Sequence, residues 1–382
     1  MKRTGLIAWL FLASMLLGVA CNQPGIADPT PQLTPPSHNN ETNNETNVES
    51  PAATPLALTD SAGLGQSPNS LPEASSDSPP SGPYLIIEKT DYIVDGLRIS
   101  NPNGHCIIIK NSSNVLIQNS TIGPCGGHGI DIQDSVDISI QANDFADVWK
   151  GVYAHRSSQV DVSNNHGLNL TSPDPIKIKA NFVQFDKVSG SGNRINYNVI
   201  RNIPGESYPE DIISLFEVEG AVADPIQVIG NRIWGGGPSA SGGGIMTGDS
   251  GGSNILVKDN ILVDPGQFGI AIAGGHNIQV VNNKIFARPQ SFNNVGIYVW
   301  RATELDETPE CREHTVLGNQ VNYSRGDGTK NGGWNSENCM PVVGWNENEW
   351  DATIDENIWD RSNCAFEKSC SPQQRQHLSS PP

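Results

Sequence analysis

The most constraining feature of this chain is a short motif that recurs along most of its length. The motif is an apolar-x-apolar segment followed by Asn, one further residue and another apolar residue. Its clearest copies span residues 138–145, 226–233, 255–262 and 278–285, and weaker copies are centred on Ser120, Asn165, Asn198 and Asn319. From Ser120 onward the successive anchor residues lie 23, 22, 33, 33, 29, 23 and 36 residues apart. The short spacing defines the basic repeat, and the longer spacings indicate inserted loops of ~7–13 residues.

A second motif, Gly-Ile-x-Ile or a close variant, precedes the anchor residues. It occurs at residues 129–132, 151–154, 175–178, 244–247, 269–272 and 296–299. Apolar residues that alternate over four positions predict a half-buried strand. Two strands and their turns within about 22 residues leave no room for a helical repeat or a four-stranded propeller blade. The sequence therefore predicts a solenoid of stacked parallel coils, in which each coil buries its apolar face on its neighbours.

These motifs resemble those of the right-handed parallel β-helix proteins of the pectate-lyase-like superfamily. The resemblance covers residues 84 to about 355 and implies an all-β fold of about nine to ten coils. It also implies that Asn side chains in the turns form an internal hydrogen-bonded ladder, at Asn143, Asn165, Asn198, Asn231, Asn260, Asn283 and Asn319.

The two ends of such a solenoid need cover, because an open strand edge invites pairing with other chains. The amphipathic helix that commonly caps the first coil in this superfamily is missing from the sequence, so residues near Tyr84 to Val94 are expected to cover that end. Residues 331–359 are irregular and carry Trp334, Trp345, Trp350 and Trp359. We expect these residues to cap the last coil, and the alternative role for the tryptophans is stacking on sugars.

The residues before the solenoid indicate export. A positively charged start, an apolar run from Leu6 to Leu17 and small residues before Cys21 predict a signal peptide over residues 1–20. Cys21 resembles the lipidated cysteine of a bacterial lipobox, although Gly18 stands where Leu is usual. Residues 21–83 are rich in Pro, Ser, Thr and Asn and predict a disordered tether, and residues 360–382 predict a loose tail. We therefore expect a lipid-anchored protein of the bacterial cell envelope, with release by ordinary cleavage as the alternative.

Six cysteines remain once Cys21 is set aside. An even number of cysteines in an exported chain indicates disulfides, although six cysteines allow fifteen pairings. Pairing each cysteine with its neighbour in the sequence predicts Cys106–Cys125, Cys311–Cys339 and Cys364–Cys370.

Side chains that face outward from successive coils stack about 4.8 Å apart in rows. The x positions of the second motif predict one row through Ile108, Asp131, Tyr153, Lys177, Ser214, Met246, Ala271 and Tyr298. The row two residues further on runs through Lys110, Gln133, His155, Lys179, Phe216, Gly248, Ala273 and Trp300. From these rows we take Tyr153, His155, Lys177 and Lys179 as catalytic candidates. Asp131, Ser214, Tyr298 and Trp300 are candidates for substrate binding, and the strip from Tyr153 to Tyr298 is about 24 Å long.

This face suits proton abstraction next to a carboxylate, as in a lyase or an epimerase that acts on a uronate polymer. The carboxylate charge must be neutralised before a base can remove the proton. Lys177 or His155 is the candidate base, Tyr153 the proton donor and Lys179 the neutralising cation. Hard oxygen ligands for Ca²⁺ are offered by Glu210, Asp211 and Asp249.

Two alternatives to this chemistry stay open. A hydrolase would use Asp211 and Asp249 as its pair of acids. A non-catalytic surface protein would bind glycans or adhere through Tyr298 and Trp300. The net charge of −18, from 23 basic and 41 acidic residues, argues against nucleic acid as a partner. The expected partners are thus a polysaccharide and, through the lipid anchor, a membrane, and the protein is expected to be a monomer.

Overall fold

The computed structural model describes residues 82–171, 180–302 and 310–361. They belong to one compact unit of the chain, Glu41–Pro382. Met1–Asn40, the other unit, lies outside the described residues.

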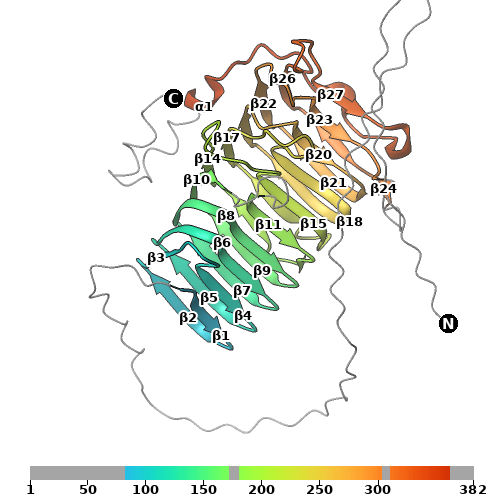
Figure 1. Cartoon of the computed structure of the whole chain (residues 1–382). Helices are drawn as coiled ribbons and strands as arrows, with labels where there is room; N and C mark the ends of the chain where they lie inside the picture. The colour runs from blue at the N-terminus through green and yellow to red at the C-terminus, as the bar shows by residue number, and fades with distance from the viewer. Residues whose placement is uncertain (1–81, 172–179, 303–309, 362–382) are drawn as a thin grey trace, which may run out of the picture. The chain divides into compact units, whose positions relative to one another are not determined.

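The described chain winds into coils that each contribute strands to three faces of a parallel β-helix (Figure 1). The first face carries the functional candidates and consists of β1 (Tyr84–Ile87), β4 (Ile107–Lys110), the second halves of β6 (Thr121–Gln133) and β8 (Asp144–His155), β11 (Asn181–Asp186), β15 (Ile213–Gly220), the start of β18 (Ile245–Lys258), β20 (Phe268–Ile272), β23 (Val295–Val299) and β27 (Gly333–Asn335).

The other two faces complete each coil. The second face consists of β2 (Thr90–Asp95), β5 (Ser113–Gln118), β7 (Val136–Gln141), β9 (Ser158–Ser163), β12 (Ser189–Gly190), β13 (Arg194–Asn196), β16 (Ile226–Ile229), the end of β18, β21 (Gly275–Val281), β24 (Cys311–Arg312) and β25 (Thr315–Leu317). The third face consists of β3 (Arg98–Asn101), the first halves of β6 and β8, β10 (His166–Leu170), β14 (Val199–Arg201), β17 (Arg232–Trp234), β19 (Ile261–Val263), β22 (Lys284–Ala287) and β26 (Gln320–Tyr323). Short helices follow at η1 (Glu337–Cys339), η2 (Trp345–Glu347) and α1 (Ile358–Arg361).

Branched apolar residues fill the interior because they stack directly on one another from coil to coil. On the first face one such column is fully buried and consists of Ile107, Ile130, Val152, Val183, Ile213, Ile245, Ile270 and Ile297. Burial of such a side chain stabilises the fold by about 1.5–3 kcal/mol. The prediction of a right-handed parallel β-helix is confirmed, and the outward row beside this column has ten positions, from Leu85 to Trp334.

Asparagine side chains form the ladder that the resemblance implies, between the second and third faces. Each Nδ2 donates to the Oδ1 of the next Asn at 2.7–3.1 Å, from Asn143 through Asn319 and on to Asn348. The residue before a ladder position has left-handed backbone, with φ of 58° at Asn164 and 56° at Asp259. This turn points the following Asn inward, where its amide satisfies buried backbone groups.

One predicted strand is misplaced. Residues 175–178 fall outside the described residues, and β11 pairs with β8 instead, with Gln184 opposite Tyr153 and Asp186 opposite His155. Gln184 and Asp186 therefore hold the row positions that the sequence assigned to Lys177 and Lys179. Phe182 explains why residues 181–186 form this strand. Its buried ring occupies the space beside Gly151 and Gly167, where a Cβ on either glycine would clash with it.

The two ends of the solenoid differ. Residues expected to cover the first coil form it instead: β1 and β2 are strands of that coil, and the exposed fractions of Leu85, Ile87 and Ile93 are 54%, 41% and 59%. At the other end Trp345 and Trp350 pack against the main core with ring centroids 4.5 Å apart. In the described part of the chain no helix is long and apolar enough to cross a membrane.

Two disulfides join neighbouring segments, Cys106–Cys125 and Cys311–Cys339. Both are pairs that the sequence predicted. Disulfides persist in oxidising compartments, so they indicate an extracytoplasmic protein. Cys21, Cys364 and Cys370 lie outside the described residues.

Candidate functional site

A group of polar and aromatic side chains gathers on the outside of the first face, around the second halves of β6 and β8. We call it the polar cluster. Its members are His105, His128, Asp131, Trp149, Lys150, Tyr153, His155, Gln184 and Asp186.

Two glycines explain why the polar cluster contains more outward-facing side chains than strict alternation along the strands predicts. A Cβ on Gly129 would meet the buried ring of Phe145, and a Cβ on Gly151 would meet that of Phe182, so both glycines face the core. Since the residue after each glycine is also buried, two successive positions face inward. The residues on either side, which include His128 and Lys150, consequently face outward.

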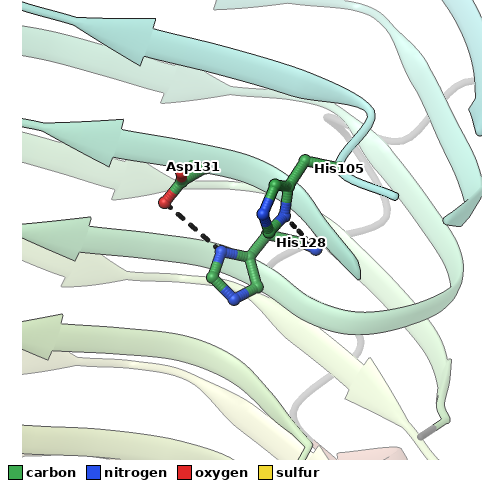
Figure 2. Close-up of side chains that lie close together, drawn as sticks. All are labelled: His105, His128 and Asp131. Carbon is green, nitrogen blue, oxygen red and sulfur yellow. Dashed lines mark hydrogen bonds and ion pairs between the residues drawn. The ribbon is translucent and has the colours of Figure 1, made fainter. Parts of the chain in front are cut away.

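His128 is a neutral imidazole held by a carboxylate. Its Nδ1 lies 3.3 Å from Oδ1 of Asp131 (Figure 2), and Gln133 Nε2 donates to the other oxygen of Asp131 at 3.0 Å. The ring lies 4.9 Å from that of Tyr153 and 5.3 Å from that of Trp149. Burial lowers the pKa of His128 to about 4, against the opposing effect of Asp131. The imidazole is therefore uncharged at neutral pH, with Nε2 turned away from Asp131.

Lys150 supplies the cation of the cluster. Its Nζ donates to Oε1 of Gln184 and lies over the rings of Tyr153 and Trp149, at 4.8 and 5.7 Å from their centroids. Burial lowers the pKa of Lys150 to about 8, and Asp186 and Asp131 partly oppose the shift. The amine is charged at neutral pH but close to its titration point.

Tyr153 supplies a protonated hydroxyl. It donates to Oδ2 of Asp186 at 2.7 Å. Burial, and then this hydrogen bond, raise the pKa of Tyr153 far above its usual value.

Both ring nitrogens of His155 face charged neighbours, so its tautomer is fixed. Its Nε2 accepts from Nη1 of Arg156 at 2.7 Å, so Nδ1 carries the proton and faces Oδ1 of Asp186 at 3.3 Å. The Nδ1 and Oδ1 atoms do not meet hydrogen-bond geometry, and the contact with Arg156 leaves His155 no lone pair to act as the base.

Two of the acidic residues expected to bind Ca²⁺ accept hydrogen bonds from protein donors. Glu210 accepts hydrogen bonds from the hydroxyls of Ser239 and Ser241, and Oδ1 of Asp211 accepts from the backbone N–H of Gly243 at 3.0 Å. Asp249, and not Gly248 as the sequence predicted, stands beside Phe216 in the second row, because the register of β18 shifts at this point. Calcium needs six to eight converging oxygens. Within residues 82–171, 180–302 and 310–361 these acids do not converge as a group of three.

Aromatic rings mark the far end of the same row. Tyr298 stacks on Trp300 at 4.1 Å, and Trp334 lies 5.1 Å from Tyr298 with an exposed fraction of 45%. The row from Tyr153 to Tyr298 takes five coil steps, or about 24 Å. Ser214 lies between them, but its exposed fraction is 4%, so it offers little surface to a ligand.

Lys177 and Lys179 lie outside the described residues. Of the other catalytic candidates, Tyr153 and His155 join the polar cluster, together with Asp131. Sequence reasoning missed His105, His128, Lys150 and Asp186. The residue directly before each Gly-Ile-x-Ile motif was the available signal, because His128 and Lys150 both occupy that place.

The fold is that of a right-handed parallel β-helix protein, and the polar cluster lies on one of its faces. The chain belongs to the right-handed β-helix region family, which it matches over residues 85–208 and 216–321.

Two solved structures resemble the fold. The catalytic domain of a GH87 α-1,3-glucanase in complex with nigerose is 14% identical with a TM-score of 0.41, and the match covers 70% of this chain and 63% of that one. A mutant DFA-IIIase from Arthrobacter chlorophenolicus A6 in complex with DFA-III is 15% identical with a TM-score of 0.33, covering 69% and 61%. The chain therefore matches less than two thirds of the length of either. No curated protein matches the sequence.

Proposed function

We propose that this protein is an enzyme that acts on a polysaccharide, by abstracting a proton next to a carboxylate in a uronate unit. The observation that carries the proposal is the set of three protonation states in the polar cluster. His128 is neutral, Lys150 is charged and Tyr153 is protonated at neutral pH, and all three share one patch of the first face.

Each group has one task in this chemistry. Lys150 neutralises the uronate carboxylate, which makes the neighbouring C–H acidic. Nε2 of His128 takes that proton, and Asp131 stabilises the imidazolium that forms. In a lyase the electron pair left on carbon then forms a double bond as the glycosidic C–O bond breaks, and Tyr153 protonates the departing oxygen. In an epimerase a proton returns to the opposite face of the same carbon.

The low pKa of His128 belongs to the protein without substrate. A carboxylate placed within about 4–6 Å favours the charged imidazole and raises its pKa. Substrate therefore strengthens the base that acts on it. The local cation also offsets the net charge of −18, which repels polyanions at longer range.

Assays on uronate and neutral polysaccharides, with and without added calcium, test this proposal. A lyase yields an unsaturated product that absorbs in the ultraviolet, and an epimerase incorporates deuterium from heavy water into the polymer. We expect His128→Asn to lower the rate by about 10²–10⁴-fold. His166→Asn is the matched control, because His166 pairs with Asp144 at 3.1 Å on the third face. Reducing ends without unsaturation would instead indicate a hydrolase.

A second candidate function, glycan binding without catalysis, is favoured by the aromatic group Tyr298, Trp300 and Trp334. Flat rings of this kind present a large apolar area with little loss of conformational entropy. In this case no polymer is turned over by the wild type. Trp334→Ala then weakens retention in polysaccharide-containing gels, while Trp359→Phe, at the buried contact with Trp234, leaves retention unchanged.

The proposal also covers where the protein is located in the cell. The disulfides fit an exported protein, and we propose that Cys21 carries the lipid that keeps it at the cell envelope. Cys21→Ser should then move the protein from the detergent phase to the aqueous phase in a phase-partition experiment.

A further inference from the structure

His105 has no task in the chemistry above, yet its contacts are specific. It lies one coil before His128, and the two ring centroids are 4.4 Å apart. Nδ1 of His105 accepts the backbone N–H of His128 at 2.9 Å (Figure 2). Gly127 makes room for this contact, since a Cβ there would lie 2.8 Å from the same nitrogen.

This hydrogen bond fixes the tautomer of His105. A backbone N–H can only donate, so Nδ1 must present its lone pair. The proton of the neutral ring is then on Nε2, which makes the outer nitrogen of His105 a hydrogen-bond donor.

His128 is fixed in the opposite sense. A carboxylate at neutral pH only accepts, so the Nδ1 that faces Asp131 at 3.3 Å carries the proton. Its Nε2 keeps the lone pair and is an acceptor. Gln133 holds the second oxygen of Asp131 at 3.0 Å and so limits its rotation.

We propose that His105 and His128 form a hydrogen-bonding pair with fixed, opposite tautomers, which binds neighbouring oxygen atoms of one sugar unit. Nε2–H of His105 donates to a sugar or carboxylate oxygen, and Nε2 of His128 accepts from a hydroxyl or takes the proton in the reaction. The second role of His128 rests on the proposed function, whereas the tautomers and sugar binding do not. His105 is thus a specificity residue that positions substrate against the base.

The same three residues raise the competing possibility of a metal. Ligand atoms of His105, His128 and Asp131 lie within 4.8 Å of one another, and three protein ligands are typical of a catalytic zinc site. A metal needs a lone pair from His105, however. The lone pair on Nδ1 is taken by the N–H of His128, and binding through Nε2 would move the proton to Nδ1, where it would oppose that N–H. The hydrogen bond and the metal are therefore mutually exclusive.

Nuclear magnetic resonance of the full-length protein with ¹⁵N-labelled histidine tests the pair directly. Two-bond correlation spectra distinguish the two tautomers, and His105→Asn and His128→Asn assign the two rings. We expect the Nε2–H form at His105 and the Nδ1–H form at His128, unchanged by added Zn²⁺ or Ni²⁺. The opposite tautomer at His105, or metal binding that His105→Asn abolishes, would overturn the proposal.

Two variants of His105 distinguish a role in positioning the substrate from a role in holding the structure together. His105→Asn keeps an acceptor for the N–H of His128 but removes the outer donor, and His105→Ala removes both. On an active polymer we expect His105→Asn to raise KM about tenfold with kcat nearly unchanged, as for one lost hydrogen bond. We expect His105→Ala also to shift the acid limb of the pH profile. If no polymer is turned over, titrating glucuronic acid into the labelled protein supplies the readout. Shifts of both Nε2 signals support the pair, and signals that do not move contradict it.

Discussion

Burial gives the residues of the polar cluster their distinct protonation states. His128 and Lys150 are both cationic when protonated, so burial lowers the pKa of each, to about 4 and about 8. Tyr153 is anionic when deprotonated, so burial raises its pKa. Between pH 4 and 8 the cluster therefore holds a neutral base beside a cation and a phenol.

This combination predicts a bell-shaped pH profile of kcat/KM, with limbs near pH 4 for His128 and near pH 8 for Lys150. Lys150→Arg should remove the alkaline limb, because a guanidinium stays charged throughout. Initial rates from pH 3.5 to 10 on the active polymer measure the effect. Lys258→Arg, on the second face, is the control and should keep both limbs. An alkaline limb that survives Lys150→Arg would show that another group titrates there.

A second histidine should affect stability instead of activity. His314 is fully buried, and burial, then the charge of His276, lowers its pKa to about 4. Its pKa in the unfolded chain is about 6.5, so the unfolded state binds the proton more tightly and stability falls as pH drops from 6.5 towards 4. At pH 5 the loss from this group is about 2 kcal/mol. Urea unfolding at pH 7 and pH 5 should show His314→Gln losing about 2 kcal/mol less than the wild type over this interval. Equal losses would contradict the assignment.

At this scale the sequence located three of the nine members of the polar cluster: Asp131, Tyr153 and His155. Tyr153 and Asp131 were found because they occupy the x position, where alternation holds. His128 and Lys150 were missed because the inward glycines Gly129 and Gly151 shift the alternation by one residue, and a sequence does not show which way a glycine faces.

Turns, as well as strands, hold the coils in register. In addition to the backbone pairing of equivalent strands, each ladder Asn makes side-chain hydrogen bonds to the neighbouring coils. Asn231 donates to the carbonyl of Ile195 at 2.7 Å and to Asn260 at 3.0 Å, and it accepts from the backbone N–H and the amide of Asn198. A column of such residues sets the distance from coil to coil at one corner.

Asn231→Ala should lower the free energy of unfolding by about 3 kcal/mol or more. The change leaves the N–H of Asn198 and the carbonyl of Ile195 without partners inside the protein, and each such group costs about 1–3 kcal/mol. Denaturant unfolding of the wild type and the variant measures the difference. Asn103→Ala, at an exposed turn, should change stability by less than about 0.5 kcal/mol. A loss below about 1 kcal/mol at Asn231 would mean that water replaces the amide.

Strand positions followed from the motifs wherever glycine precedes the strand. The exception is β11, which begins Asn181-Phe-Val183 instead of Gly-Ile, so the motif search selected the nearby Pro-Ile-Lys-Ile segment. Packing decides between the two segments, because Phe182 and Phe185 fill the core between coils and Ile176 and Ile178 are smaller. The choice between the two segments depends on packing against neighbouring coils, which a pattern within one segment of sequence does not show.

As a whole the described domain is a one-dimensional stack, in which inner coils have two neighbours and terminal coils have one. The disulfides lie towards the two ends: Cys106–Cys125 follows the first coil, and Cys311–Cys339 joins the last two. The repeat predicted the stack, but it did not predict that Asn348 extends the ladder beyond the last clear motif. The segment around Asn348 nevertheless fits the motif, with apolar Val343 and Trp345 before it and Trp350 two residues after it, so the sequence carried this signal as well.

We predict that removing a terminal disulfide loosens the adjacent end and leaves the middle intact. Cys311 and Cys339 close a sequence separation of 28 residues, for which the cross-link contributes about 3.5 kcal/mol. Because each coil contacts only its neighbours, the double change Cys311→Ser and Cys339→Ser should speed amide exchange of β23 and β27 by about two orders of magnitude. Exchange of β15 and β16 should not change, and Cys106→Ser with Cys125→Ser should affect β1 and β4 instead. Hydrogen exchange followed by mass spectrometry resolves these segments. Uniform acceleration along the chain would show that the coils unfold as one cooperative unit.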